Sequence, residues 1–371
     1  MAGARVRPGG LVHTGGSIPD TESDAPYEAA DALPSFPAAV LAGHGKAVTK
    51  AAFAAGAARV ITASHDKTAK LFDVASGQCE QTFEGHAGGV LWVAMSPDGA
   101  RVVTGAADTT ARVYDAATGV CECVLEGHRA QVNMALFSAD GSKILTTGAD
   151  RVARLFDAKT GACVQTYQDH LGPLFTAVYS PDGKNVLTAS LDKTAKVYDT
   201  QTGKCEVTFV GHGAHIYMAA FSPDASKVVT ASADASARVW DAGTGRCLAT
   251  LARHGAAVYS AAFSADGAKV LTASNDGNAR LFDAQTATCE RTFEGHVRAV
   301  HSAAFSPDET QVVTASDDRS VRVFDIATGA CLATLEGFGE HVFGATFSPD
   351  GAQILTASED GMAKLFAVRD T

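Results

Sequence analysis

A spacing of 42 residues runs through nearly the whole of this 371-residue chain and constrains its fold more than any other feature. Seven histidines mark this period and Phe338 takes the eighth place; the histidines are His44, His86, His128, His170, His212, His254 and His296. An aromatic residue recurs in the same frame, at Phe72, Tyr114, Phe156, Tyr198, Trp240, Phe282, Phe324 and Phe366. Because the register never slips, we expect eight copies of one structural unit from about residue 37 onward.

Each unit contains four short strand-like segments separated by turn signals. In one unit, residues 257–264 and 269–274 alternate apolar and polar side chains around an Ala-Asp-Gly turn, and a third segment follows at 278–283. The fourth segment ends just before the next Gly-His, and helical spacing is absent throughout. Four strands per unit of this length predict an all-β, eight-bladed β-propeller of four-stranded antiparallel blades.

The Gly-His and aromatic-Asp dipeptides of residues 37–371 resemble those of the WD-repeat family. The resemblance implies a buried polar network in each blade, formed in the fifth by His212, Thr230, Asp234 and Trp240. The threonine recurs in all eight units, at Thr62, Thr104, Thr146, Thr188, Thr230, Thr272, Thr314 and Thr356. The aspartate does so at Asp66, Asp108, Asp150, Asp192, Asp234, Asp276, Asp318 and Asp360. Eight copies of one Ser/Thr-His-Asp trio favour an architectural role over catalysis.

Two departures from the family pattern affect this network. Seven of the eight tryptophan positions hold Phe or Tyr, and Phe cannot donate the indole hydrogen bond. In the last unit Phe338 also replaces the histidine, so we expect Asp360 to lack its partner. The eighth blade is therefore predicted to be the least rigid.

The last unit ends after its third strand, and the N-terminal part of the chain offers the missing fourth. Residues 37–41 precede Gly43-His44 in the register that Cys331 to Leu335 occupy in another unit. We expect this N-terminal strand to close the ring and to remove an open sheet edge. Residues 1–36, rich in Gly, Pro and acidic residues, are predicted to form a flexible tail, and residues 37–371 the propeller.

Charge and composition narrow the classes of partner. The formal net charge is −11, and no basic run or long apolar stretch is present, so we expect neither nucleic-acid nor membrane binding.

Seven of the eight cysteines recur one per unit, which predicts small buried residues rather than disulfides or a metal site. We expect no metal and no cofactor, and a location in the cytoplasm, with the nucleus as the alternative.

The resemblance also implies that partners bind the ring face that carries the loops leading into the innermost strands. The fifth residue after each histidine position is exposed there in the family, and in units four to eight it is aromatic: Phe175, Tyr217, Tyr259, His301 and Phe343. Neighbouring family positions add His215, His341, Asp317 and Glu359. These residues predict an aromatic arc with an acidic edge that docks an apolar or basic peptide segment. The alternative is that the rings pack on one another and only cover the mouth of the central channel of the propeller, without binding a partner.

The function expected from these features is a non-catalytic scaffold or adaptor that binds other proteins, as a monomer within a larger assembly. One alternative is a reader of a peptide or a modified cationic residue, with the arc as an aromatic cage. The other is an enzyme with a site at the channel mouth. That site needs convergent acids and imidazoles, for which Asp317, Glu359 and His301 are the candidates.

Overall fold

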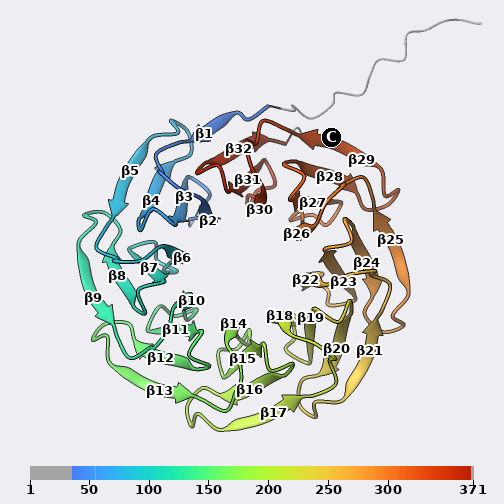
Figure 1. The fold of residues 1–371 in the computed structure, drawn as a ribbon, viewed down its shortest axis with the longest axis horizontal. Coiled ribbons are helices and arrows are strands. Elements are labelled where there is room, and N and C mark those ends of the chain that lie inside the picture. Colours follow the sequence, from blue (N-terminus) through green and yellow to red (C-terminus); the bar gives the residue numbers. More distant parts are fainter. Residues whose placement is uncertain (1–35, 55, 369–371) are drawn as a thin grey trace, which may run out of the picture. The chain divides into compact units, whose positions relative to one another are not determined.

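The computed structural model describes residues 36–54 and 56–368, which lie in one compact unit spanning Leu33–Thr371. Its elements are 32 strands in eight four-stranded antiparallel sheets, and the sheets form a ring (Figure 1). The predicted all-β, eight-bladed propeller is thereby confirmed. The tail predicted over residues 1–36 lies outside the described residues, apart from Phe36.

Each blade consists of four consecutive strands, except the eighth, which consists of β30, β31 and β32 with β1 as its fourth strand, paired with β32. The strands of blades 1 to 4 are β2 (Val48–Phe53), β3 (Arg59–Ser64), β4 (Ala69–Asp73), β5 (Cys79–Phe83), β6 (Val90–Met95), β7 (Arg101–Ala106), β8 (Ala111–Asp115), β9 (Cys121–Leu125), β10 (Val132–Phe137), β11 (Lys143–Gly148), β12 (Ala153–Asp157), β13 (Cys163–Tyr167), β14 (Leu174–Tyr179), β15 (Asn185–Ser190), β16 (Ala195–Asp199) and β17 (Cys205–Phe209). Those of blades 5 to 8 are β18 (Ile216–Phe221), β19 (Lys227–Ser232), β20 (Ala237–Asp241), β21 (Cys247–Leu251), β22 (Val258–Phe263), β23 (Lys269–Ser274), β24 (Ala279–Asp283), β25 (Cys289–Phe293), β26 (Val300–Phe305), β27 (Gln311–Ser316), β28 (Val321–Asp325), β29 (Cys331–Leu335), β30 (Val342–Phe347), β31 (Gln353–Ser358), β32 (Ala363–Ala367) and β1 (Ala39–Leu41).

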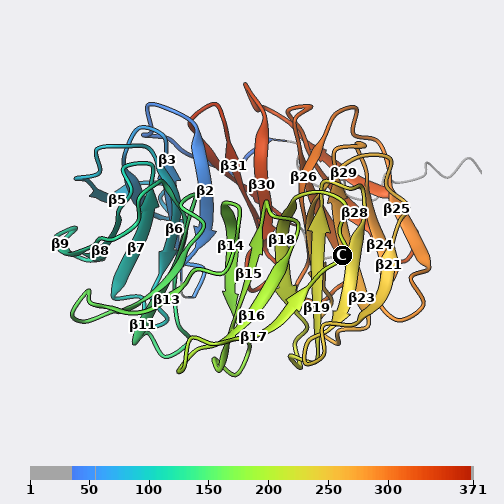
Figure 2. The same cartoon turned by 60° about the horizontal axis from the view of Figure 1, so that its bottom comes forward.

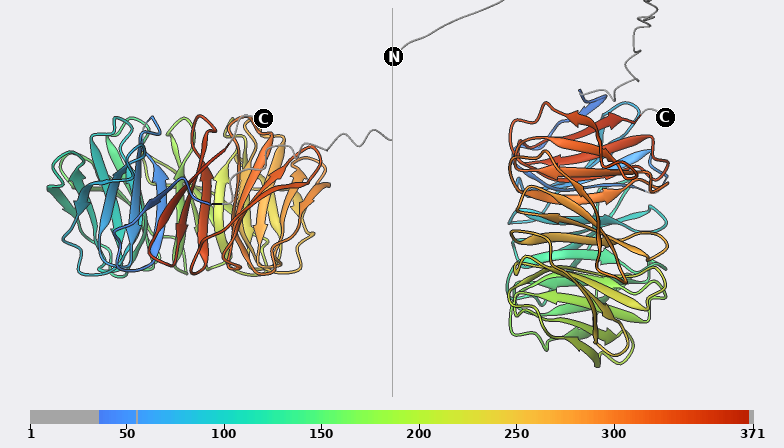
Figure 3. Two further views of the ribbon diagram at one scale, coloured as in Figure 1. Left: turned by 90° about the horizontal axis from the view of Figure 1, so that it is seen from above. Right: turned by 90° about the vertical axis from the view of Figure 1, so that its right-hand side faces the viewer.

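The first strand of each repeat lies nearest the centre of the ring, and the fourth lies on the rim (Figure 1). Seen from the side, the inner strands run from one face of the ring to the other (Figures 2 and 3). All inner strands run in the same sense, since each begins a repeat. Residues at the start of an inner strand therefore gather on one ring face, together with the turn that joins the second and third strands of the same blade.

Hydrophobic cores lie between neighbouring blades. One core packs Ile61, Leu71 and Phe83 of blade 1 against Val102 and Tyr114 of blade 2, and all five side chains are almost completely buried. Each side chain of this size contributes roughly 1.5–3 kcal/mol when it leaves water. The alternation of apolar residues along each strand thus stabilises the ring one blade interface at a time.

The first and last blades meet through β1. Strand β1 pairs antiparallel with β32, and Leu41 is opposite Ala363 in the register. Leu41 is fully buried, in a core that also holds Leu365 of β32 and Phe72 of blade 1. The sheet edge of the last blade is therefore covered by the segment before the first repeat.

Among the described residues, no helix is long and apolar enough to cross a membrane.

Candidate functional site

A β-bulge at the start of every inner strand aims one side chain at the ring face. In β14 the pairing with β15 shifts between Leu174 and Thr176, which makes Phe175 the extra residue. The same shift singles out Tyr217 in β18 and Tyr259 in β22. It also singles out His301 in β26 and Phe343 in β30. Because a bulge bends the strand and re-aims its extra side chain, the backbone places these five side chains at equivalent positions in their blades.

The five arc residues contact one another in an unbroken series across blades 4 to 8. Ring centroids are 6.0 Å apart for Phe175 and Tyr217, and 5.5 Å apart for Tyr217 and Tyr259. The Tyr259 and His301 rings are stacked at 5.1 Å, and His301 meets Phe343 edge-on at 6.2 Å. Such pairs contribute about 0.5–1.5 kcal/mol each beyond their buried area, so the arc is held in place before any partner arrives.

The arc remains partly open to solvent. Phe175 is 40% exposed, and the other four residues are half-buried. Burial raises the pKa of Tyr259, and the nearby Tyr217 and Asp317 act in the same direction. The rings thus pack on their neighbours and also present apolar surface on the face.

The bulge positions of blades 1 to 3 carry Thr49, Leu91 and Asn133 instead of aromatic residues. The Thr49 hydroxyl donates to the Val90 carbonyl at 2.9 Å, and the Asn133 amide donates to the Leu174 carbonyl at 2.7 Å. These polar side chains join adjacent blades, and the aromatic arc therefore covers only part of the ring.

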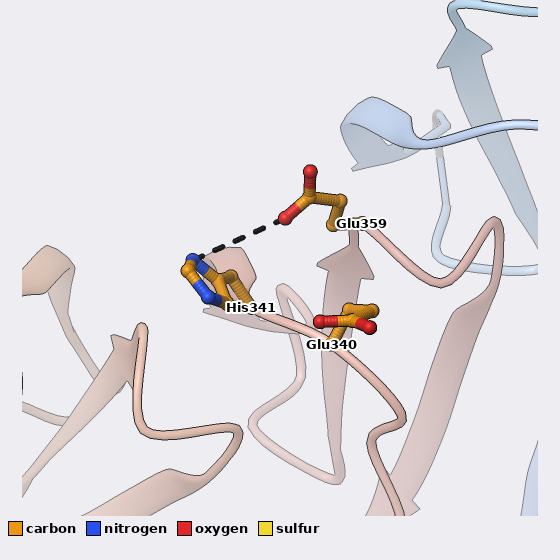
Figure 4. A group of neighbouring side chains, drawn as sticks. All are labelled: Glu340, His341 and Glu359. Carbon is orange, nitrogen blue, oxygen red and sulfur yellow. Dashed lines mark ion pairs between the residues drawn. The ribbon is translucent and has the colours of Figure 1, made fainter.

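Acidic and imidazole groups meet at one end of the arc. Asp317, in the turn after β27, has its Oδ1 atom 2.7 Å from His301 Nε2 and 2.9 Å from His341 Nδ1. Glu359, in the turn after β31, lies 3.9 Å from His341 Nδ1 (Figure 4). One carboxylate thus joins an imidazole of blade 7 to an imidazole of blade 8. We call Asp317, His341 and Glu359 the acidic end of the arc.

The acidic end has the donor atoms that a divalent cation uses. Ligand atoms of Glu340, His341 and Glu359 lie within 4.8 Å of one another, although both glutamates are exposed (Figure 4). Glu340 also lies 3.7 Å from an Arg319 guanidinium nitrogen. The cluster can attract a cation or exchange a proton, and its open position equally suits a basic side chain of a partner.

His215 lies apart from this cluster. It is exposed, and its Nδ1 donates to the Leu191 carbonyl of the preceding blade at 2.6 Å. The contact joins His215, two residues before Tyr217 in the sequence, to blade 4. The sequence-predicted residues therefore divide into an aromatic series, an acidic end and this single histidine.

The blade networks take the form that the repeat predicts. In blade 1, His44 Nδ1 lies 2.8 Å from Asp66 and its Nε2 2.7 Å from the Thr62 hydroxyl. The same two contacts occur in blades 2 to 7 at 2.7–3.0 Å and 2.7–2.8 Å respectively. Blade 5 adds the Trp240 indole, which donates to Thr230 at 2.8 Å. Because a carboxylate only accepts, Nδ1 carries the proton and Nε2 accepts from the threonine.

Burial sets the charge states of these networks. It lowers the pKa of His44, His86, His212 and His254, against the opposing effect of their aspartates. Burial alone raises the aspartate pKa, but hydrogen bonds from threonine or serine, histidine and backbone outweigh it. They hold the pKa of Asp66, Asp108 and Asp234 at about 2. Blades 1, 2 and 5 therefore each contain a neutral imidazole beside an ionised carboxylate.

The expectation that Asp360 lacks a partner in blade 8 is wrong. Lys364 donates to Asp360 Oδ2 at 2.9 Å and to the Gly337 carbonyl at 2.8 Å, and its ammonium lies 4.5 Å from the centre of the Phe338 ring. The Lys364 side chain is 3% exposed. A basic residue at this register occurs in every unit, from Lys70 to Lys364, and it is the sequence signal that was missed.

The cysteines are not the buried residues that their size predicted. All eight are free; four are exposed and four half-buried. Each of the seven periodic cysteines begins the outermost strand of its blade, as Cys79 begins β5. A position on the rim overrides the preference of a small apolar side chain for the interior.

A cavity on another part of the ring lies away from the arc. It has a volume of about 560 Å³ and is lined by turn residues of blades 3 and 4, among them Ser138, Asp140 and Asp182. These turns follow the ends of β10 and β14, whereas the arc begins at the start of β14. The two features therefore lie on opposite faces of the ring.

The family profile described as "WD domain, G-beta repeat" matches eight consecutive segments, 35–73, 77–115, 119–157, 161–199, 203–241, 245–283, 287–325 and 329–366. The chain belongs to the WD-repeat family. WD-repeat propellers are typically protein-interaction scaffolds. The computationally designed protein Ika8, known from a crystal structure, is similar to it. The two share 27% sequence identity with a TM-score of 0.80, over 90% of this chain and 99% of that one. No curated protein matches the chain.

Proposed function

We propose that this WD-repeat protein is a non-catalytic scaffold or adaptor, and that it binds a protein partner through the aromatic arc of blades 4 to 8. The observation that carries the proposal is the unbroken series of ring contacts from Phe175 to Phe343 on one ring face. The rings are partly exposed and already fixed by mutual packing. Rigid aromatic groups bury much area on binding at a small cost in side-chain entropy, which is why they dominate binding hot spots.

The partner segment that fits this face is an apolar peptide with a basic residue at one end. Apolar side chains contact the arc from Phe175 to Tyr259, and a Lys or Arg side chain meets Asp317 and Glu359 at the acidic end. The formal net charge of −11 favours the approach of a basic segment. The scaffold acts as a monomer within a larger assembly, in the cytoplasm or the nucleus.

Affinity capture with matched variants tests the role of the arc. Proteins captured from cell extract by the wild-type chain are compared with those captured by Tyr217→Ala/Tyr259→Ala. Truncation of two central hot-spot rings costs at least about 2 kcal/mol, which lowers the affinity roughly 30-fold or more. Leu91→Ala, at the same bulge position in blade 2, serves as the control and retains capture. Undiminished capture by the double variant, with the fold intact, would refute the proposal.

A reader of cationic residues is the second candidate, and the acidic end of the arc is the observation that favours it. Titration with labelled basic peptides separates it from general scaffolding. A reader binds one such peptide tightly, and loses the affinity in Asp317→Asn while Tyr217→Ala has less effect. A scaffold loses affinity mainly in the tyrosine variants. An enzyme at the channel mouth is the remaining alternative; it is supported only by the approach of Asp317 to His301 and His341.

A further inference from the structure

A lysine with no hydrogen-bond acceptor or counter-ion among the described residues lies inside the ring, at the position six residues after each blade histidine. Lys50 of β2 occupies it in blade 1, and the seven equivalent positions hold uncharged residues, from Trp92 in blade 2 to Gly344 in blade 8. Among the described residues, nothing accepts a hydrogen bond from the Lys50 ammonium or forms an ion pair with it. An unpaired ammonium in such a place destabilises the fold, so its presence calls for a ligand.

The Lys50 ammonium lies over the face of the Trp92 ring, 4.6 Å from its centre, and this cation–π contact offsets part of the cost of its burial but accepts no hydrogen bond. Protein atoms surround it closely, and burial lowers the pKa of this group, although the side chain keeps some accessible surface. The Trp92 indole N–H is also buried and has no acceptor. Two hydrogen-bond donors from neighbouring blades thus lie side by side with nothing to receive their protons. A buried unpaired donor costs about 1–3 kcal/mol, which an acceptor recovers when it binds.

Both residues line one cavity of about 240 Å³, whose wall is formed mainly by the inner strands of blades 1 and 8, with Trp92 from blade 2 and Ser302 from blade 7. Gly344 opens this cavity, because a Cβ atom placed there would have no neighbour within 4 Å. Ser302, Thr49 and Thr346 contribute hydroxyl residues to the wall, and Phe343, Ala345 and Leu355 form an apolar side. The cavity therefore combines one cationic corner with an apolar side.

We propose that this cavity binds a small organic carboxylate, whose charged group faces Lys50 and the Trp92 indole and whose short apolar part lies beside Phe343. A carboxylate carries one charge and two oxygens, which one ammonium and one indole N–H can satisfy. A phosphate dianion requires more charge and more donors than the wall provides. The site adjoins the proposed peptide-binding arc and shares Phe343 with it, but its two hydrogen-bond donors, Lys50 and Trp92, lie outside the arc.

The two tryptophans of the chain, Trp92 and Trp240, make the site directly observable. In the full-length protein with 15N-labelled tryptophan, Trp92→Phe assigns the two indole N–H signals. Sodium butyrate is then titrated at constant ionic strength. We expect a saturable shift of the Trp92 signal with no movement of Trp240, and at least tenfold weaker binding of inorganic phosphate. An unshifted or linearly drifting Trp92 signal would mean that the cavity holds water only, and it would overturn the site.

Three variants separate the site from a general charge effect. Lys50→Met removes the ammonium, and it should fold with an equal or higher Tm because blades 3 and 5 already carry Met134 and Met218 at this position. Gly344→Leu fills the cavity without touching either donor. Both are expected to weaken butyrate binding at least tenfold, whereas Lys159→Met, on an exposed turn of blade 3, leaves it unchanged. Equal binding by Lys50→Met and Lys159→Met contradicts the proposal, and phosphate binding tighter than butyrate contradicts the ligand class.

Discussion

The substitution Lys364→Met tests the replacement network of the eighth blade. It removes the ammonium that bonds to Asp360 and to the Gly337 carbonyl, and it leaves an unbranched side chain that still packs on Phe338. Asp360 keeps the backbone N–H groups of Gly339 at 3.1 Å and Met362 at 3.0 Å, but loses its only cationic contact. Burial then raises the pKa of the Asp360 carboxyl without the opposing effect of Lys364.

The magnitude follows from the burial of the pair. The Lys364 and Asp360 side chains are 3% and 12% exposed, so this is an interior ion pair rather than a surface one. Removing one partner of such a pair costs about 3–5 kcal/mol, and the two remaining backbone bonds favour the lower value. A loss of about 3 kcal/mol lowers the Tm of a domain of this size by about 4 °C.

Two further variants make the comparison sharp in thermal unfolding. Lys196→Met, at the same register in blade 4, removes a lysine that bonds only to the Thr208 hydroxyl at 3.1 Å, and should cost less than about 1 kcal/mol. Phe338→His/Lys364→Met restores the histidine of the other seven blades, and should recover most of the lost stability. Hydrogen exchange should show the loss of protection first in β30–β32.

Equal shifts of Tm for Lys364→Met and Lys196→Met would refute the reasoning, because the ion pair with Asp360 is what distinguishes the two lysines. The reasoning also fails if the added histidine brings no recovery, since the geometry of seven blades implies that an imidazole at this position can bond to the aspartate.

Two other predictions concern the ring as a whole. The four blade histidines with a lowered pKa bind more protons in the unfolded than in the folded protein between pH 6.5 and their folded pKa. Stability should therefore fall as the pH decreases through that interval, by up to about 5 kcal/mol per pH unit in denaturant titrations. The aspartates with a pKa of about 2 should add a further loss of stability between pH 3.8 and 2. A stability that does not change from pH 7 to 5 would contradict the presence of neutral imidazoles. Deleting residues 1–43 exposes the edge of β32 and should unfold or oligomerise the protein, whereas deleting residues 1–35 should not. A monomer of unchanged Tm after the longer deletion, by light scattering and calorimetry, would show that β1 is dispensable.

The strands and the number of blades could be predicted from the sequence because the same pattern occurs eight times in the chain. The segments expected at 269–274 and 278–283 are β23 (Lys269–Ser274) and β24 (Ala279–Asp283). The arc positions followed from the same register. An error in one unit would have conflicted with the other seven, so local ambiguities were resolved by repetition.

Contacts between blades were less accessible, because they depend on the curvature of the ring. Asp317 and His341 belong to different repeats, and only the closed ring brings their side chains to 2.9 Å. The burial of the cysteines was mispredicted for a related reason. Their apolar character does not indicate whether their strand lies in the interior or on the outer rim of a blade. The contact between Lys364 and Asp360 is different, because it lies within one repeat and a basic residue occurs at the Lys364 position in every unit. The family pattern pairs the aspartate with the histidine alone, so it gives no indication of this contact.

Eight copies within one chain also separate the residues that build the fold from those that can carry function. The histidine, threonine and aspartate of the network recur because every blade must satisfy the same buried groups, and where Phe338 breaks the pattern Lys364 fills the gap. The bulge position has the same backbone in all eight blades but carries polar or aliphatic residues in three and aromatic residues in five consecutive ones. The position of Lys50 varies just as freely, and only there does it carry a charge. Since the backbone is equivalent in every blade, these differences are not required by the repeated architecture, and we therefore place both binding proposals, the arc and the Lys50 cavity, at positions that the architecture leaves free to vary.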